Sequence, residues 1–151
     1  MLKKGDAAPG FELTDDTGNT VRLADLAGKR VMVYFYPKAD TPGCTKQACA
    51  LQDLGPMIDD ESITVIGISP DKPEKLAKFR AKYHLGFILL SDPEHQVAEA
   101  YGAWGEKSMY GKKYMGIIRS HAAIDEDGNL LAIENKVKPL STAALAKELW
   151  G

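Results

Sequence analysis

The sequence predicts an α/β fold: a central mixed β-sheet flanked by helices, preceded by an N-terminal β-hairpin. Continuous apolar runs at residues 31–36 and 63–69 are typical of strands that are buried on both faces. Helical segments alternate with these runs, which favours parallel strands joined by crossover connections. Near the C-terminus, two further apolar runs flank an Asp- and Gly-containing turn and add antiparallel strands. A chain of 151 residues is one domain's length, so we expect a single domain over residues 1–151.

The N-terminal half is expected to hold a hairpin followed by two strand–helix pairs. Two short runs with alternating hydrophobicity flank the turn-forming segment DDTGN at 15–19, which predicts the hairpin. The first buried strand ends at Pro37, and Gly55-Pro56 is expected to end or kink the helix that follows. The expected strands are 11–14, 21–23, 31–36 and 63–69, and the expected helices are 41–54 and 72–83.

The C-terminal half is expected to hold shorter elements and one long connection. Residues 102–116 contain four glycines and several aromatic residues, and we interpret them as a long ordered loop. Ser141 is predicted as the N-cap of the last helix. The expected strands are 87–90, 117–124 and 130–135, and the expected helices are 94–101 and 141–150. This order of elements is compatible with a thioredoxin-like architecture.

Composition and charge argue against several classes of protein. Hydrophobic residues make up 44% and charged residues 26%, which is typical of a globular domain. The net charge of −2 lacks the basic excess of a nucleic-acid binder, and no apolar run approaches the ~20 residues of a membrane span. Residues 1–6 carry two lysines with no apolar stretch behind them, so we expect no secretory signal and a cytoplasmic location. We also expect a monomer that binds neither nucleic acid nor membrane.

The segment around Cys44 carries the strongest chemical signal. A buried strand leads through a turn into a helix for which Thr41 is the expected N-cap and Pro42 the first residue. Cys44 then lies in the first helical turn, where free backbone N–H groups and the helix dipole stabilise a thiolate over a thiol. Capping would be served equally well by Glu or Gln at this position, so capping does not explain the cysteine.

Residues 36–45, which read YPKADTPGCT, resemble the active-site segment of peroxiredoxins. More narrowly, they are similar to the bacterioferritin comigratory protein or PrxQ-like subfamily. The resemblance covers nearly the whole chain in order. It continues at residues 67–71, 89–92, 101–107, 110–112 and 116–120.

The resemblance implies a role for each matching residue. Cys44 matches the peroxidatic cysteine, which attacks a peroxide oxygen and becomes a sulfenic acid. Thr41 matches the threonine whose hydroxyl contacts that sulfur and the peroxide, and Pro37 matches the proline that shields the pocket. Arg119 matches the arginine that holds the thiolate and polarises the peroxide. Cys49 matches the resolving cysteine of those members that carry it in the same helix.

The implied activity is a thiol-dependent peroxidase that reduces hydrogen peroxide and small organic hydroperoxides without haem, flavin or metal. Gly43 is expected to line the substrate pocket. Thioredoxin or a glutaredoxin-like protein is the implied reductant. An alternative with the same chemistry is a peroxide-sensing redox switch, in which oxidation of Cys44 changes a partner interaction. Turnover with a recycling reductant would separate the enzyme from the switch.

Other functional interpretations are weaker. The three histidines, His84, His95 and His121, lack zinc-like spacing with the cysteines and are interpreted as ordinary surface or core residues. Four residues separate the cysteines, whereas a disulfide reductase of the thioredoxin type would have two. The aromatic residues of 102–116 are expected to pack the loop rather than to stack on nucleic-acid bases. At the run from His121 to Ala123 the family usually has larger apolar residues, so the resemblance does not predict the detailed shape of the pocket.

Overall fold

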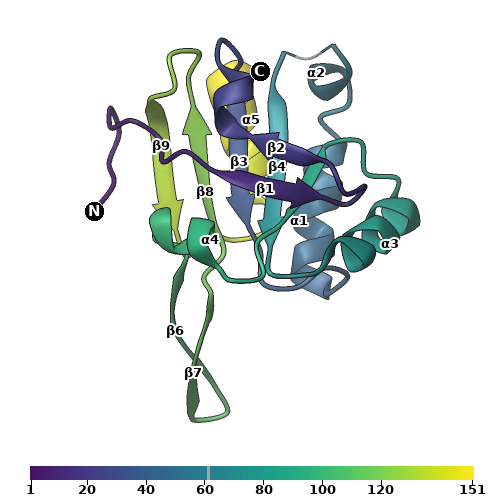
Figure 1. Cartoon of the computed structure of the whole chain (residues 1–151), viewed down its shortest axis with the longest axis vertical. Helices are drawn as coiled ribbons and strands as arrows, with labels where there is room; N and C mark the ends of the chain where they lie inside the picture. The colour runs from purple at the N-terminus through teal and green to yellow at the C-terminus, as the bar shows by residue number, and fades with distance from the viewer. Residues whose placement is uncertain (61) are drawn as a thin grey trace.

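The computed structural model describes residues 1–60 and 62–151, and Figure 1 shows their arrangement. The strands are β1 (Glu12–Asp15), β2 (Thr20–Arg22), β3 (Val31–Phe35), β4 (Thr64–Ser69), β5 (Ile88–Ser91), β6 (Trp104–Met109), β7 (Lys112–Ile117), β8 (Ser120–Ile124) and β9 (Leu130–Asn135). The helices are the 3-10 helix η1 (Leu23–Leu26), α1 (Pro42–Gln52), α2 (Pro56–Asp59), α3 (Pro73–Tyr83), α4 (Gln96–Ala100) and α5 (Ser141–Trp150).

The central sheet is mixed, as the sequence predicts. Its strand order is β2-β1-β5-β4-β3-β8-β9, in which β3, β4 and β5 run parallel and the outer pairings are antiparallel. The N-terminal hairpin is confirmed as β1–β2 and pairs with β5. Together with the covering helices this is a thioredoxin-like fold, and β3 lies between β4 and β8 in its middle.

Side-chain alternation on β3 gives the sheet two cores, one on each face. Met32 and Tyr34 belong to the core beneath α1, α3 and α5, whereas Val33 and Phe35 belong to the core on the opposite face, beside α4. All residues of β3 are buried, which explains why its sequence is continuously apolar rather than alternating. The site residues at the end of β3 are therefore held by a strand that is packed on both faces.

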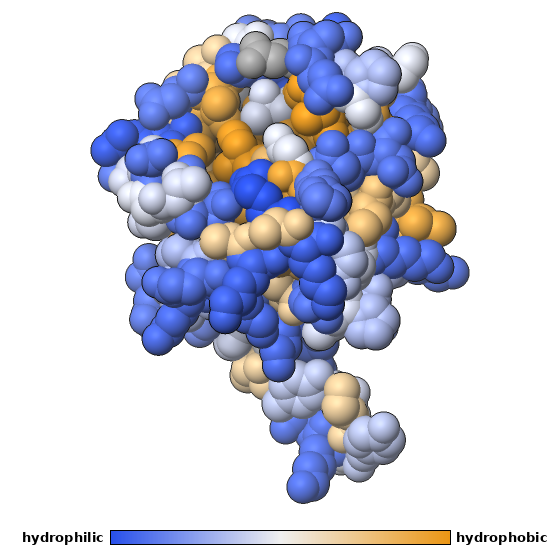
Figure 2. Space-filling view, turned by 90° about the vertical axis from the view of Figure 1, so that its right-hand side faces the viewer, coloured by the Kyte–Doolittle hydropathy of each residue, from blue (hydrophilic) through white to orange (hydrophobic). Residues whose placement is uncertain are grey.

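The prediction of a long loop at 102–116 is wrong. These residues form the hairpin β6–β7, which projects away from the sheet in Figure 1. Tyr110 and Gly111 make its turn with φ of 52° and 79°, the positive values that a tight two-residue hairpin turn requires. Tyr110 is 98% exposed and Tyr114 is half-exposed, so these tyrosines do not pack the segment as expected. Figure 2 shows the hairpin as a projection below a largely hydrophilic body.

Two further boundaries differ from the expected ones. The strand expected at 117–124 is interrupted, because β7 ends at Ile117 and β8 begins at Ser120. Arg119 lies in this interruption, where its carbonyl accepts a hydrogen bond from the Val137 N–H. Ser141 is the first residue of α5 rather than its N-cap, and its N–H donates to the Lys138 carbonyl. By contrast, α1 ends before Gly55-Pro56 as predicted.

Within 1–60 and 62–151, none of the helices has the length and apolarity needed to traverse a lipid bilayer. In the same residues, no group of three or more His, Cys, Asp or Glu side chains is placed to hold a metal ion.

Candidate active site

Cys44 lies in the first turn of α1, directly after the loop that follows β3. Pro42 and Gly43 precede it in the helix, and Thr41 occupies the N-cap position with extended backbone angles, as the sequence predicts. The Cys44 side chain is buried. The positive end of the helix dipole and the unpaired N–H groups of the first turn therefore act on a sulfur that is shielded from bulk water.

Arg119 supplies the cation at this sulfur. Its Nη2 lies 3.4 Å from Cys44 Sγ, within hydrogen-bonding distance for sulfur. The antiparallel register between β3 and β8 explains the contact, because Phe35 pairs with Ser120 and the preceding Arg119 reaches the end of β3. Seventy-five residues of chain separate the two groups, and the sheet brings them together.

Gln47 fixes the other arm of the guanidinium. Arg119 Nη1 donates to Gln47 Oε1 at 2.6 Å, and the Gln47 side chain is fully buried one helical turn after Cys44. A charged donor and a neutral amide at this distance form a strong hydrogen bond. Gln47 is not among the site residues predicted from the sequence. Its spacing of three residues from Cys44, which places both on one helix face, is the signal that could have indicated it.

The absence of a side chain at Gly43 lets the Arg119 guanidinium approach Cys44 Sγ. A Cβ built on Gly43 would lie 3.0 Å from Arg119 Nη2. A side chain here would therefore press on the guanidinium that contacts the sulfur. Gly43 thus provides space for the guanidinium, and its expected place in the substrate pocket stays a prediction.

Thr41 and Pro37 occupy the loop at the mouth of the site. The Thr41 hydroxyl donates to the Lys38 carbonyl at 2.7 Å, and among the described residues the hydrogen bond to Cys44 Sγ comes from Arg119 and not from Thr41. Since its single proton is engaged, the oxygen of Thr41 is left as an acceptor. Pro37 lines a cavity of about 560 Å³ together with Arg119, and its expected shielding of the pocket stays a prediction.

Lys107 adds positive charge to this cavity, which Lys136 and Glu106 also line. It reaches in from the β6–β7 hairpin, and its Nζ donates to the Ile117 carbonyl at 2.8 Å. Burial, and then the nearby Arg119 charge, lower the pKa of Lys107. The sequence analysis did not single out Lys107, because it interpreted this segment as a loop rather than as a hairpin beside Arg119.

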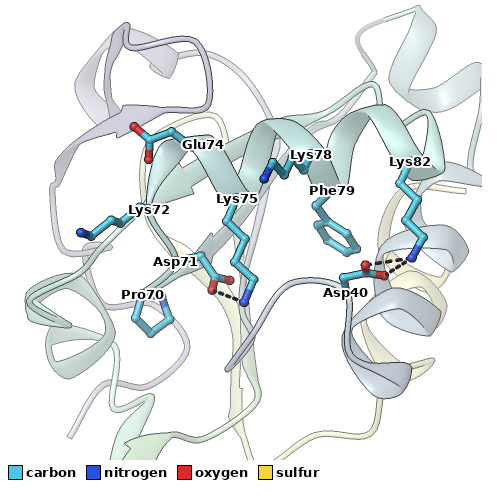
Figure 3. Close-up of a pocket in the computed structure, with 9 residues that line it drawn as sticks. All are labelled: Asp40, Pro70, Asp71, Lys72, Glu74, Lys75, Lys78, Phe79 and Lys82. Carbon is cyan, nitrogen blue, oxygen red and sulfur yellow. Dashed lines mark hydrogen bonds and ion pairs between the residues drawn. The ribbon is translucent and has the colours of Figure 1, made fainter.

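A larger cavity, of about 850 Å³, lies along α3 and holds none of the cysteines (Figure 3). Its border includes Asp40, which belongs to the loop before α1 and adopts a positive φ of 63°. Lys82 Nζ donates to the Asp40 carboxylate at 2.9 Å, and the Tyr83 hydroxyl donates to it at 2.6 Å. These contacts tie the loop before Cys44 to the end of α3.

Cys49 shares α1 with Cys44 but lies toward its other end. It is half-buried, and both cysteines are free thiols. Burial, followed by the charge of Asp53, raises the pKa of the Cys49 thiol. Its surroundings therefore favour the neutral thiol in the folded helix.

Comparisons with known proteins bear on the family of this chain. The family model described as AhpC/TSA family matches residues 4–133. Peroxiredoxin Bcp of Escherichia coli strain K12 is 55% identical over 129 residues, which cover 85% of this chain and 83% of that protein. A putative peroxiredoxin of Mycobacterium tuberculosis strain H37Rv is 53% identical over 146 residues, covering 97% of this chain and 92% of that protein.

The chain belongs to the peroxiredoxins of the AhpC/TSA family.

Solved structures place this peroxiredoxin among the Bcp and PrxQ proteins. A cysteine-to-serine mutant of Xylella fastidiosa PrxQ superposes with a TM-score of 0.90 at 27% identity, covering 99% of this chain and 96% of that one. A mutant of Xanthomonas campestris Peroxiredoxin Q gives a TM-score of 0.85 at 33% identity, covering 92% and 89%. The predicted resemblance is thus confirmed, and thiol peroxidase activity follows from it.

Proposed function

We propose that this peroxiredoxin reduces hydrogen peroxide and small organic hydroperoxides at Cys44, forms an intramolecular disulfide with Cys49, and is recycled by thioredoxin or a glutaredoxin-like protein. The contact of 3.4 Å between Arg119 Nη2 and Cys44 Sγ carries the proposal. A permanently charged donor beside a buried sulfur at a helix N-terminus favours a nucleophilic thiolate. A Xanthomonas campestris relative, solved as an intermediate and ligand complex, is described by its alkyl peroxide reduction activity, which supports organic hydroperoxides as substrates.

In the first step, the Cys44 thiolate attacks one oxygen of the peroxide. An S–O bond forms and the O–O bond breaks, so that sulfur is oxidised to a sulfenic acid and the peroxide is reduced. The second oxygen leaves as hydroxide or alkoxide and takes up a proton. Arg119 donors stabilise the negative charge that develops on the oxygens, and the Thr41 oxygen accepts a hydrogen bond from the peroxide O–H.

In the second step, Cys49 attacks the sulfenic sulfur of Cys44. The S–S bond forms, the S–O bond breaks, and the oxygen leaves as water with the proton of the Cys49 thiol. An intact α1 opposes this step. Helix geometry places the two Cα atoms about 8–9 Å apart, whereas a disulfide requires about 4.4–6.8 Å.

The first turns of α1 must therefore unwind before the disulfide closes. On one side, the Asp40 contacts with Lys82 and Tyr83 hold the preceding loop. On the other side, Ala48 and Leu51 are fully buried in the core and hold the second half of the helix. The unwinding of α1 is thus confined to the residues between the Asp40 contacts and the buried second half of the helix.

In the third step, an external dithiol reduces the Cys44–Cys49 disulfide by thiol–disulfide exchange and is itself oxidised. This step needs a reducing compartment, for which we propose the cytoplasm. It also separates the enzyme from the alternative of a peroxide-sensing switch, because a switch is oxidised without rapid recycling.

The test is peroxide consumption coupled to a thioredoxin system, with a glutaredoxin system in parallel. We expect sustained turnover with one of the dithiol systems, and no turnover for Cys44→Ser. Oxidation of one equivalent of Cys44 without recycling by either system would instead favour the switch. No oxidation of Cys44 by any peroxide would contradict both.

A further inference from the structure

The hydrogen bonds of Arg119 continue into the interior through the Gln47 side chain, which is fully buried. Beyond Arg119, Gln47 Nε2 lies 2.9 Å from Thr142 Oγ1. Thr142 Oγ1 lies 2.8 Å from His121 Nδ1, and His121 Nε2 lies 3.2 Å from Glu134 Oε2. Gln47 and Thr142 are 0% exposed, His121 is 1% exposed, and Glu134 reaches solvent. An unbroken chain of polar groups thus runs from the active site to the surface.

The directions of these hydrogen bonds follow from the chemistry of each group. Arg119 can only donate, so the Gln47 amide must turn its oxygen toward the arginine and its NH₂ toward Thr142. The Thr142 oxygen accepts that bond, which leaves its single proton to be donated to His121 Nδ1. The ring proton of His121 then lies on Nε2 and is donated to Glu134. Burial lowers the pKa of His121, in agreement with a neutral ring.

The chain joins three separate parts of the fold. Gln47 lies on α1, Thr142 in the first turn of α5, and His121 on β8, two residues after Arg119. Without an acceptor at Thr142, the Gln47 amide would bury an unpaired NH₂, which costs free energy and favours displacement of the side chain from this position. Such a displacement would weaken the hydrogen bond from Arg119 Nη1 to Gln47 Oε1 that holds the guanidinium.

We propose that Thr142, supported by His121, is a positioning residue for peroxide cleavage. It orients the Gln47 amide, and the amide in turn holds the Arg119 guanidinium against Cys44 Sγ. The proposal rests on the proposed function, since it concerns the same reacting sulfur. It gives His121 a role, whereas the sequence analysis interpreted it as an ordinary histidine.

The test compares Thr142→Val with Thr142→Ser. Valine has nearly the shape of threonine but lacks the hydroxyl, whereas serine keeps the hydroxyl and loses a methyl group. Tyr101→Phe is the matched control, because it removes a buried hydroxyl that donates to the Pro9 carbonyl in the other core. Three quantities are measured: the rate of Cys44 oxidation in a single turnover, the thiolate absorbance against pH, and the free energy of unfolding in urea.

We expect Thr142→Val to slow Cys44 oxidation by about 5- to 30-fold, because small displacements of a positioning group have effects of this order. Its thiolate absorbance should rise at higher pH than in the unmodified protein, since the arginine is less well placed. Thr142→Ser should restore the rate to within about 2-fold, and Tyr101→Phe should leave rate and titration unchanged.

The proposal is overturned if Thr142→Val is less stable but keeps the rate and the thiolate titration of the unmodified protein. The chain would then only connect α5 to the sheet. If Thr142→Val does not fold, Thr142→Ala decides, because it also lacks the oxygen that accepts from the Gln47 amide. An unchanged oxidation rate in that variant overturns the proposal. Failure of the proposed function is a different result, since the unmodified protein would then not be oxidised at Cys44 by peroxide.

Discussion

Cys44 and Cys49 lie on one helix, and their surroundings are opposite in charge. Cys44 is fully buried near the N-terminal end of α1 with Arg119 at its sulfur, whereas Cys49 is half-buried near the C-terminal end with Asp53 nearby. The helix dipole reinforces the difference, because its positive end is at Cys44 and its negative end faces Cys49. In the proposed reaction, position along a single helix thus assigns the two cysteines to different steps.

Replacing each cysteine with serine should give the largest effect on peroxide reduction. Cys44→Ser should lose peroxide reduction by at least about 10³-fold, because a serine hydroxyl remains protonated and is a poor nucleophile. Cys49→Ser should still consume one equivalent of peroxide, form no intramolecular disulfide and accumulate sulfinic acid faster. Mass spectrometry after stoichiometric peroxide distinguishes these products. Equal loss of the first oxidation in both variants would contradict the division of roles.

Removing the positive charge of Arg119 beside Cys44 should give the next largest effect on the rate of Cys44 oxidation. Arg119→Met should slow Cys44 oxidation by about 10²–10³-fold, the usual loss for one donor to a developing negative charge. Its thiolate absorbance should also rise at higher pH, because a neutral side chain no longer stabilises the thiolate. Arg80→Met is the control, since Arg80 is bound to Asp16 and the Leu85 carbonyl instead. Identical titration curves for Arg119→Met and the unmodified protein would remove Arg119 from the site.

Filling the space beside Arg119 should change the stability of the protein and the rate of Cys44 oxidation in opposite directions. Gly43→Ala places a methyl group 3.0 Å from Arg119 Nη2, so we expect Cys44 oxidation to slow by about 10-fold. Alanine also favours the helix over glycine by up to about 1 kcal/mol. Urea unfolding and stopped-flow oxidation measure the two effects. A variant with unchanged oxidation would mean that Arg119 relaxes without leaving the sulfur.

Neutralising the charge near Cys49 should give the smallest effect. Burial is the larger cause of the raised pKa of Cys49 and Asp53 the second, so Asp53→Asn should lower this pKa modestly. A raised thiol pKa means that the reactive thiolate is lost as pH falls, so disulfide formation should accelerate with rising pH. We expect Asp53→Asn to accelerate it by about 2-fold near neutral pH, with a pH profile displaced to lower pH. Rapid acid quench followed by thiol counting gives the rate, and an undisplaced profile would contradict the effect of Asp53.

The sequence predicted the sheet and the position of Cys44 because these depend on short-range signals. The continuous apolar run of β3 and the Thr41-Pro42 cap fix a strand end and a helix start within fifteen residues. The hairpin β6–β7 was missed because its strands are largely exposed and show no buried periodic face. A non-glycine residue, Tyr110, also takes the first positive-φ position of its turn.

The candidate site was predicted where a residue matched the family and was missed where it acts through another side chain. Cys44 and Arg119 were identified from the resemblance, and the register of β3 and β8 brings them together. Gln47, Thr142 and His121 come from α1, α5 and β8, and no local pattern shows that their side chains meet. Such contacts depend on the packing of distant elements, which the hydrophobic periodicity does not encode.

In the proposed reaction, α1 holds Cys44 in the folded protein and also unwinds so that the disulfide can form. These two demands on one helix have a consequence for adaptation to heat. Thermophilic relatives of a fold gain stability from many small changes, and better helix formers are among the easiest to acquire. In this protein, such changes in the first turns of α1 would strengthen the segment that, in the proposed reaction, opens for Cys49 to reach Cys44. Natural selection and protein engineers would therefore have to seek added thermal stability elsewhere, for example in α5 or the outer strands, and leave the start of α1 marginal.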